Sequence, residues 1–235
     1  MSAAVVYLIP TVLHEGAVET IPAYVLAAIK ECKVLFVEHE RTARRFLKLL
    51  WKEADINSYE WHNIKDLTPD VLSAFTTALR TYAVIGIMSE AGCPGVADPG
   101  QHLIAIAQKE HATVKPLVGP NSILLALMAS GMNGQQFQFV GYLPIENEQK
   151  ISVIKRLEAE SAQKNLTQIF IETPYRNNHL ATVLTKTCKP HTLLCIASQL
   201  TSGEEFVKTN TIQAWRSSLP DLHKKATIFL LYSGV

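Results

Sequence analysis

Short apolar runs alternate with helical patterns through the first half of the chain, and this alternation constrains the fold more than any other feature. Runs of β-forming residues lie at 4–9, 33–37 and 83–88, and a segment with helical periodicity follows each of them. Weaker strand signals lie at 57–61 and 113–117. Strands that alternate with helices at this spacing are typical of a doubly wound sheet. We therefore predict an N-terminal α/β domain with a largely parallel sheet.

The helices between these strands carry recognisable start signals. Pro22 suits the first position of a helix that runs to about Glu31, and Thr68 followed by a proline is typical of a capped helix start. The segment 41–52 has an apolar face at helical spacing, which predicts an amphipathic helix. Asp98 precedes a proline in the same way, so we expect it to cap a helix from about Gly100.

The second half of the chain follows a looser rhythm. It opens with the break at 119–120 and an apolar helix at 122–130, and polar helical segments lie further along. Strand signals lie at 137–142, 168–172, 192–197, 205–208 and 227–232. Because some of these strands have no helix between them, we predict a mixed sheet. The predicted domains are residues 1–116 and 117–235.

Composition excludes several classes of protein. With 48% hydrophobic and 18% charged residues, the composition is not that of a disordered protein. The formal net charge of +1 is too small to attract nucleic acid to the surface as a whole. The four cysteines form no C-x-x-C pair, so we expect reduced thiols and no metal site. No apolar run approaches the roughly 20 residues of a membrane helix. We expect a cytoplasmic protein with no membrane partner.

The loop after the predicted strand 83–88 is the first candidate for a ligand site, because ligands bind open α/β sheets at the carboxyl ends of the strands. Its sequence, S-E-A-G-C-P-G-V-A-D-P-G at 89–100, is rich in glycine and proline. Such a loop has a fixed shape and a backbone that a ligand can approach closely. A long, well-capped turn would explain the same residues. The chain has no G-x-G-x-x-G, Walker or G-x-S-x-G motif.

A second candidate is the segment 116–122, which leads into the apolar helix. Its Gly-Pro break and its Asn and Ser residues would leave N–H groups and a hydroxyl at a helix N-terminus, where a carboxylate or a ribose could bind. A capped hinge without a ligand is the alternative, and it is favoured if this segment is considered alone.

The loop at 89–100 resembles the S-D-A-G-T-P-x-x-x-D-P-G loop of the tetrapyrrole methylase superfamily. Further matches follow in chain order at 10–11, 38–41, 116–122, 141–144, 171–176 and 234. The resemblance covers essentially the whole chain and is strongest to the branch that methylates a ribose 2′-hydroxyl in small-subunit ribosomal RNA. It implies a parallel-sheet domain followed by a mixed-sheet domain, a cleft between them that holds S-adenosylmethionine, and a homodimer.

The resemblance also implies which residues contact this cofactor. They are Pro10, Glu90, Cys93, Asn121, Ser122, Tyr142, Leu143, Pro174, Ala197, Thr227 and Ile228. Methyl transfer requires the methyl carbon, the sulfur and the acceptor atom to lie in line, so positioning is the main task of such a site. The methyl donor is already activated, so no metal is required.

The segment 38–41 corresponds, by the same resemblance, to the substrate side. A ribose hydroxyl is weakly acidic, so a general base assists as its proton leaves. Glu38 and His39 are the predicted catalytic residues, and Glu172 is a further candidate base. Each of the three is equally plausible as a strand-end carboxylate or a surface imidazole. The family has an aspartate where this chain has His39.

A run of basic residues predicts where an acceptor would bind. Arg41, Arg44, Arg45, Lys48 and Lys52 recur at helical spacing along one face. The first three are the predicted substrate-binding residues, and RNA is the partner that they favour. A solvated face of an amphipathic helix is the alternative. Methylation of a small molecule such as a tetrapyrrole, and a non-catalytic nucleotide- or RNA-binding protein, also stay open as functions.

Overall fold

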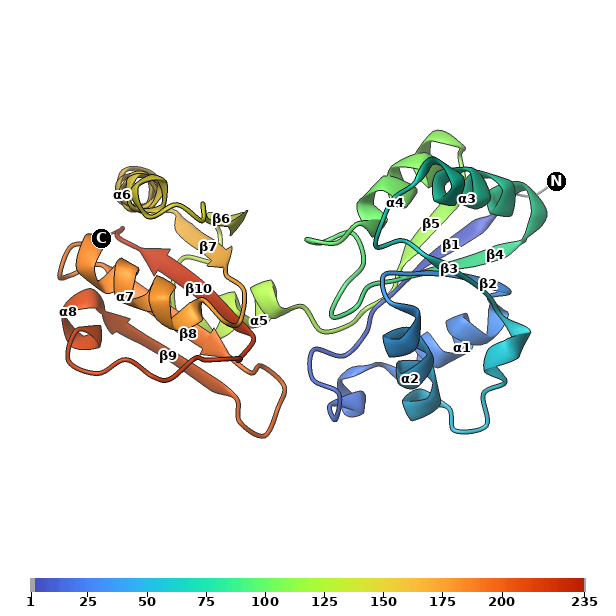
Figure 1. Ribbon diagram of the computed structural model, residues 1–235, viewed down its shortest axis with the longest axis horizontal. Helices are drawn as coiled ribbons and strands as arrows, with labels where there is room; N and C mark the ends of the chain where they lie inside the picture. The colour runs from blue at the N-terminus through green and yellow to red at the C-terminus, as the bar shows by residue number, and fades with distance from the viewer. Residues whose placement is uncertain (1–2, 235) are drawn as a thin grey trace. The chain divides into compact units, whose positions relative to one another are not determined.

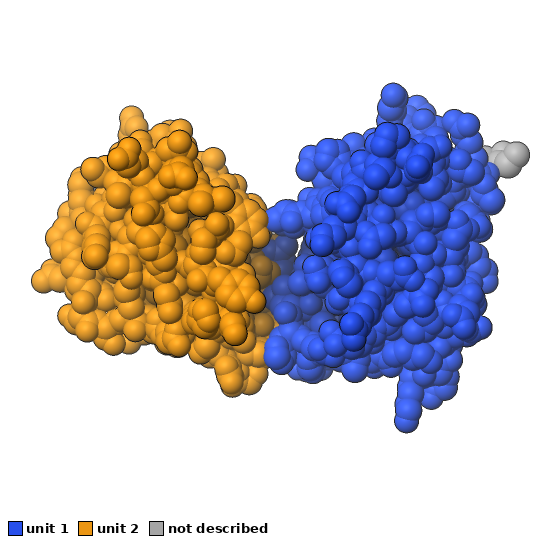
Figure 2. All heavy atoms as spheres, in the orientation of Figure 1, with its two compact units in different colours: residues 1–121 blue, residues 122–235 orange. Residues whose placement is uncertain are grey.

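The chain divides into two compact units, Met1–Asn121 and Ser122–Val235, which Figure 2 shows in different colours. The structure is a computed structural model that describes residues 3–234. The division lies after Asn121, whereas the sequence placed it after residue 116. The difference arises because residues 117–121, here called the hinge segment, belong to unit 1. Leu117 donates its N–H to the Leu8 carbonyl, and Cys93 Sγ lies 3.5 Å from the Pro120 carbonyl oxygen.

Unit 1 is a parallel sheet with helices between its strands (Figure 1). Its elements are β1 (Val5–Ile9), α1 (Ala23–Glu31), β2 (Val34–Val37), α2 (Glu40–Leu50), β3 (Glu60–Asn63), α3 (Pro69–Thr81), β4 (Val84–Met88), α4 (Gly100–Lys109) and β5 (Thr113–Pro116). The strand order is β3-β2-β4-β1-β5, and every pair of neighbours is parallel. The predicted parallel sheet is thus confirmed.

Alternate residues of the buried strands face opposite layers of unit 1. Leu35 and Val37 of β2 pack with α1 and α2, whereas Val34 and Phe36 of the same strand pack with α3 and α4. All four residues are fully buried. Burial of each such side chain contributes roughly 1.5–3 kcal/mol to stability. The two helical layers leave the carboxyl ends of the strands as the edge from which the long loops emerge.

Four local predictions for unit 1 were wrong in detail. Pro22 is not the first residue of α1: it has extended backbone angles and is the N-cap residue, so the helix begins at Ala23. The strand expected at 57–61 lies at Glu60–Asn63, because Asp55 accepts the Asn57 N–H and starts a short 3₁₀ helix. Helix α2 ends at Leu50, so Lys52 lies outside it. Asp98 is not the N-cap residue of α4, because Pro99 already has helical angles and takes that position. The Asp98 side chain still accepts the N–H of Gly100.

Unit 2 is built on a mixed sheet (Figure 1). Its elements are α5 (Ser122–Ser130), β6 (Phe137–Tyr142), α6 (Asn147–Lys164), β7 (Thr167–Ile171), α7 (Asn177–Thr187), β8 (Leu193–Ser198), β9 (Phe206–Thr211), α8 (Ile212–Trp215) and β10 (Thr227–Tyr232). The strand order is β6-β7-β10-β8-β9, in which only the β6–β7 pair is parallel. The predicted mixed sheet is confirmed.

The core of unit 2 lies between this sheet and the helices α6, α7 and α8. Phe170 of β7 and Phe229 of β10 stack with their ring centroids 6.1 Å apart and are fully buried. Helix α5 packs against β8, β9 and β10, and Thr209 donates its hydroxyl to the Ser130 carbonyl at the end of that helix. Within residues 3–234, no helix has both the length and the apolar character needed to cross a bilayer.

Candidate functional site

The loops that follow β1 and β4 are tied together at the carboxyl edge of the unit 1 sheet. Thr11 and Gly92 form a backbone bridge with N···O distances of 2.9 and 3.2 Å. The Thr11 hydroxyl also donates to the Ser89 carbonyl at 3.3 Å. Gly92 has a φ of +78°, a conformation that favours glycine. Two loops predicted to contact a cofactor, the loop after β1 that begins at Pro10 and the loop after β4 that contains Glu90 and Cys93, are therefore bonded to each other.

Glu38 lies at the same edge, directly after β2. Its Oε2 accepts the N–H of Glu90 at 3.0 Å, which joins the end of β2 to the loop after β4. Burial raises the pKa of Glu38, and the nearby carboxylates of Asp98 and Glu90 raise it further, although the N–H of Glu90 acts in the opposite direction. A carboxylate with a raised pKa is a stronger proton acceptor than an ordinary one.

Asp98 shapes the loop after β4 from within. Its Oδ1 accepts the N–H groups of Gly95 and Gly100, at 3.1 and 2.6 Å, so it closes the loop onto the start of α4. Its Oδ2 is buried, and the Asp98 and Glu38 carboxyl groups lie close enough to share a hydrogen bond when one of them is protonated. Burial raises the pKa of Asp98 as well. Asp98 therefore fixes the loop and also contributes to the raised pKa of Glu38.

Cys93 connects this loop to the hinge segment. Its thiol lies 3.8 and 3.5 Å from the carbonyl oxygens of Gly119 and Pro120. Burial raises the pKa of Cys93, whereas a side-chain hydrogen bond with Asn121 lowers it. A Cβ atom at Gly119 would lie only 2.1 Å from the Cβ of Pro10, so the hinge passes directly against the loop after β1.

The predicted acceptor residues lie on or beside α2. His39 is the exposed N-cap residue of that helix and makes no capping hydrogen bond through its side chain. Arg44 pairs with Glu40 and lies over the Trp61 ring.

The other two arginines differ in their partners. Arg45 pairs with Glu15 at 3.1 Å, and Arg41 is exposed. Two of the three predicted arginines thus already have carboxylate partners within the chain.

A shallow hollow of about 140 Å³ lies beside α2 within unit 1. Its lining comes from the loop after β1, from α2 and from the loop after β4. The lining residues are Val12, Leu13, Glu15, Thr42, Arg45, Phe46, Leu49, Glu90 and Ala91. Glu90, one of these residues, donates its N–H to the Glu38 carboxylate.

In unit 2, several predicted cofactor residues lie side by side at one end of the strands of the mixed sheet. Ile228 of β10 pairs with Ala197 of β8 on one side and with Ile171 of β7 on the other, and Ile171 pairs in turn with Tyr142. Thr227 is hydrogen-bonded to the Ser198 hydroxyl at 3.1 Å.

The two neighbouring predicted residues differ in their exposure. Leu143, directly after β6, is buried, whereas Pro174 in the turn after β7 is exposed. Tyr142 has 62% of its surface exposed and is available to a ligand.

A β-bulge shapes this edge at the end of β6. Phe139 and Tyr142 pair with Ile169 and Ile171, so one extra residue lies on the β6 side. Gly141 has a φ of +70°, and a Cβ atom there would meet nothing within 4 Å. The bulge therefore leaves open space beside Gly141, where the backbone is not paired with β7. Such a space could admit the adenosine part of a cofactor.

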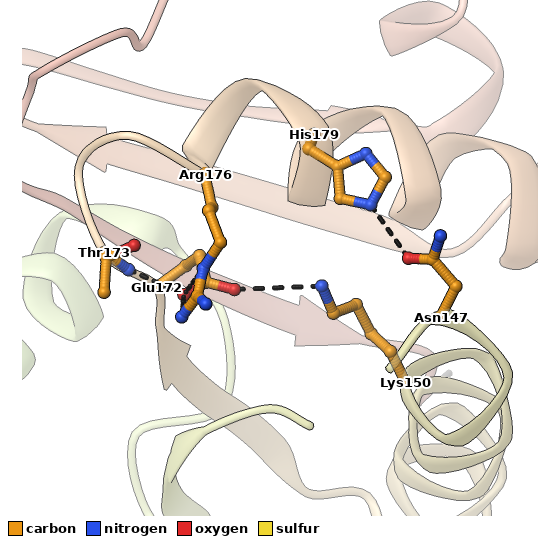
Figure 3. A network of polar contacts seen from close by, with 6 residues as sticks. All are labelled: Asn147, Lys150, Glu172, Thr173, Arg176 and His179. Carbon is orange, nitrogen blue, oxygen red and sulfur yellow. Dashed lines mark hydrogen bonds and ion pairs between the residues drawn. The ribbon is translucent and has the colours of Figure 1, made fainter. Parts of the chain in front are cut away.

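Figure 3 shows that Glu172, a candidate base from the sequence, is enclosed in a polar cluster. The Glu172 side chain has 0% of its surface exposed, and its Oε1 accepts hydrogen bonds from the Thr173 N–H and from Nε and Nη2 of Arg176. Because its carboxylate is fully enclosed, Glu172 offers no surface that a substrate could reach to transfer a proton. Sequence reasoning missed Lys150, whose buried ammonium faces Glu172, because it lies on a helix with a largely polar sequence.

The structure brings the predicted residues together in two groups, one per unit. In unit 1 they are Pro10, Glu38, Glu90, Cys93 and Asn121, and in unit 2 they are Tyr142, Leu143, Pro174, Ala197, Thr227 and Ile228. Ser122 is the first residue of α5. Residues 3–234 contain no group of three or more His, Cys, Asp or Glu side chains that could hold a metal ion.

Comparison with known proteins identifies the family. The sequence model of the tetrapyrrole (corrin/porphyrin) methylases matches residues 15–215. The chain belongs to this family. Among its relatives is the ribosomal RNA small subunit methyltransferase I of Halalkalibacterium halodurans, which is 31% identical over 72% of this chain and 55% of the relative. The protein of that name from Streptococcus pyogenes is 27% identical over 97% of this chain and 76% of the relative.

Several solved structures share this fold. Diphthine synthase has a TM-score of 0.70 at 14% identity, over 98% of this chain and 90% of the other. The methyltransferase CobJ has a TM-score of 0.62 at 19% identity, over 99% and 95%. A uroporphyrin-III C-methyltransferase from Thermus thermophilus in complex with S-adenosylhomocysteine has a TM-score of 0.58 at 13% identity, over 98% and 97%. At these identities the likeness shows the fold alone.

The first relative is considerably longer than the matched part of this chain. The match to the Halalkalibacterium halodurans protein covers about half of that relative, 55% of its length. The matched family region nevertheless includes the loops after β2 and β4, the hinge, the β6 bulge and the turn after β7.

Proposed function

We propose that this chain is an S-adenosylmethionine-dependent methyltransferase that methylates RNA, with a ribose 2′-hydroxyl as the acceptor. The observation that carries the proposal is membership of the tetrapyrrole methylase family across residues 15–215. The names of the relatives, ribosomal RNA small subunit methyltransferase I, support RNA as the acceptor. Of the predicted residues, Glu38 follows β2, and Glu90 and Cys93 follow β4, at the carboxyl ends of parallel strands, where ligands of open α/β sheets bind.

The residues present fit S-adenosylmethionine. In unit 1, the bonded loops after β1 and β4, with Glu90 and Cys93, would hold the methionine part of the cofactor through backbone groups. In unit 2, the open bulge at Gly141 and the adjoining ends of β7, β8 and β10 would hold the adenosine. The cofactor supplies a methyl group already activated on a sulfonium centre, so the chain has to position it and the acceptor.

Glu38 is the residue that we propose as general base. Its carboxylate would take the proton that the acceptor hydroxyl releases, and its raised pKa improves it as an acceptor at neutral pH. Its bond to the N–H of Glu90 holds it beside the cofactor loop. His39, which is exposed at the N-terminus of α2, would assist in orienting the acceptor.

Arg41, Arg44 and Arg45 are proposed to bind the RNA backbone. Arg41 is exposed and would contact phosphate directly, whereas Arg44 and Arg45 would exchange a carboxylate partner for a phosphate. Such contacts release counterions, so the affinity for RNA should fall steeply with salt. The hollow beside α2 is of a size to admit part of a nucleotide, and Glu90 in its lining is bonded to Glu38.

The test is methyl transfer from tritium-labelled S-adenosylmethionine to total RNA from cells that lack the protein. We expect label in RNA at nucleotides whose 3′ linkage resists alkaline hydrolysis, because a methylated 2′-oxygen cannot attack the neighbouring phosphate. Label in a small-molecule extract but not in RNA would contradict RNA as the acceptor. Binding of S-adenosylhomocysteine without transfer to either would contradict catalysis and favour a non-catalytic RNA-binding role.

Two further features belong to the same proposal. We propose that the protein acts in the cytoplasm, where its RNA acceptor would be available, and that it works as a homodimer, as the resemblance implies. Light scattering coupled to gel filtration measures the second directly. A mass equal to a single chain of 26.0 kDa at micromolar concentration would contradict the dimer.

A further inference from the structure

The turn after β7 is held by an unusually complete set of contacts. The Arg176 N–H donates to the Thr173 carbonyl at 2.9 Å, which closes a four-residue turn with Pro174 at its second position. The Pro174 carbonyl in turn accepts the N–H of Lys224, at 3.1 Å, from the segment that leads into β10. The apex of the turn, Pro174 and Tyr175, is exposed.

Glu172 binds both ends of this turn with one oxygen atom. Its Oε1 accepts the Thr173 N–H at 2.7 Å, and it accepts Nε and Nη2 of Arg176 at 3.0 and 2.6 Å. Arg176 is the N-cap residue of α7. One buried carboxylate thus joins the end of β7, the turn and the start of the next helix.

Lys150 supplies a second positive charge to the same carboxylate from α6. Its Nζ lies 3.8 Å from Glu172 Oε2, which has no hydrogen-bond partner among residues 3–234. The side chain of Lys150 has 2% of its surface exposed, and that of Glu172 has none. Asn147, one turn earlier on α6, bonds to His179 of α7 and holds the two helices together around this cluster (Figure 3).

Burial of a carboxylate and an ammonium is costly, and hydrophobic residues of similar size often replace such a pair without loss of stability. Stability alone therefore does not explain the cluster. What an apolar replacement could not supply is an acceptor for the N–H of Thr173 and a partner for Arg176. These are the two contacts that shape the turn, whose exposed apex contains Pro174, one of the residues predicted to contact the cofactor.

We propose that Glu172 is a positioning residue: its buried carboxylate, held between Lys150 and Arg176, fixes the turn from Thr173 to Arg176 in the form that binds the adenosine side of the cofactor. The inference rests on the proposed function, because it assigns Glu172 to the cofactor site and not to proton transfer. It predicts that loss of the acceptor atom weakens cofactor binding even when the fold is intact.

Two double variants separate the acceptor atom from the buried charge. Both replace Lys150 with methionine, so that neither leaves an uncompensated ammonium in the interior. In Glu172→Gln/Lys150→Met, the amide oxygen can still accept from the turn. In Glu172→Met/Lys150→Met, a side chain of similar length offers no acceptor, and Thr173 and Arg176 lose their partner. Both variants are neutral at these positions, so their comparison isolates the hydrogen bonds.

The readouts are the Kd for S-adenosylhomocysteine by calorimetry and the KM and kcat for methyl transfer. We expect the glutamine variant to bind within about twofold of wild type, and the methionine variant to bind about tenfold or more weakly, as expected for one or more lost hydrogen bonds. The KM for S-adenosylmethionine should rise in parallel. The kcat at saturating cofactor should stay within about twofold, because the proposed base is untouched.

Glu158 provides a matched control in the same unit. It is also a buried carboxylate, and it accepts the Lys189 N–H at 2.8 Å and the Thr192 hydroxyl at 2.6 Å in the segment after α7, away from the turn. Glu158→Met should lower the melting temperature and leave the Kd unchanged.

Equal affinity of the methionine double variant and wild type would overturn the inference, as would an equal loss of affinity in Glu158→Met. A wild-type protein that binds neither S-adenosylmethionine nor its product would overturn the proposed function itself, and this inference with it.

Discussion

Gly119→Ala is the substitution for which the structure gives the clearest steric consequence. A Cβ atom at this position would lie 2.1 Å from the Cβ and 2.4 Å from the Cγ of Pro10. Carbon atoms in ordinary contact are about 3.5–4.0 Å apart, so the overlap is severe. The proline ring cannot rotate away because its φ is fixed. The next residue, Thr11, is bonded to Gly92, so the loop after β1 cannot yield on its own.

The expected cost follows from overpacking, which typically destabilises by about 1–3 kcal/mol. The value should lie toward the upper end because both partners are backbone-constrained. For a chain of this size, such a loss corresponds to a fall in melting temperature of roughly 3–10 °C. The displaced hinge should also weaken binding of S-adenosylhomocysteine, because Cys93 and the loop after β4 lie against it.

The assay is thermal unfolding followed by circular dichroism, together with calorimetric titration of S-adenosylhomocysteine. Gly16→Ala is the matched control in the same unit, since a Cβ there would meet only the His14 ring at 3.7 Å, an ordinary contact. It should change the stability by less than about 0.5 kcal/mol. If Gly119→Ala were as stable as Gly16→Ala and bound ligand equally well, the close approach of the hinge to Pro10 would be refuted.

Three further predictions concern the titrating and charged groups. Burial raises the pKa of Glu38, so the native state binds this proton more tightly than the unfolded chain does, and stability falls as the carboxyl ionises. The difference in melting temperature between Glu38→Gln and wild type should therefore grow in favour of the variant as the pH rises from about 4 to about 7. Methyl transfer by the variant should fall by about 10²-fold or more. A temperature difference that does not change with pH, or unchanged turnover, would contradict this. Arg41→Ala should reduce the slope of log affinity for single-stranded RNA against log salt by about 0.7, and Lys186→Ala on α7 should not; equal slopes would refute the role of Arg41. Cys93 is only half-buried, whereas burial raises the pKa of Cys32 to about 12, so a maleimide at pH 8 should label Cys93 before Cys32. Bound S-adenosylhomocysteine should slow the labelling of Cys93. A labelling rate that the ligand does not change would contradict the place of Cys93 in the site.

The sequence predicted most of the fold because its strongest patterns are local. The run at 83–88 has no polar residue, and it forms the central strand β4. The start signal at Thr68 also reflects local chemistry, because its hydroxyl accepts the N–H of Val71 in the structure. The edge strand β3 was misplaced because its sequence, E-W-H-N, has no alternation of apolar and polar residues, and Glu60 and Asn63 at its two ends are exposed.

The candidate site was only partly predictable, for a different reason. The resemblance indicated residues such as Ala197 and Ile228, and the sheet register makes them neighbours although they lie far apart in sequence. The partners of Glu172 depend on how α6 packs against β7, and no periodicity in the sequence encodes that Lys150 is buried. The raised pKa of Glu38 likewise arises from burial and, to a smaller extent, from Asp98, and only the folded loop supplies both.

The most direct test of the central claim, that strand-end loops of both units bind S-adenosylmethionine, is hydrogen–deuterium exchange with and without saturating S-adenosylhomocysteine. We predict slower exchange in the loop at 89–100 of unit 1 and, in unit 2, at the β6 bulge and the turn after β7, with little change in α3 and α7. Protection confined to one unit, or no protection at these loops despite measurable binding, would contradict the account.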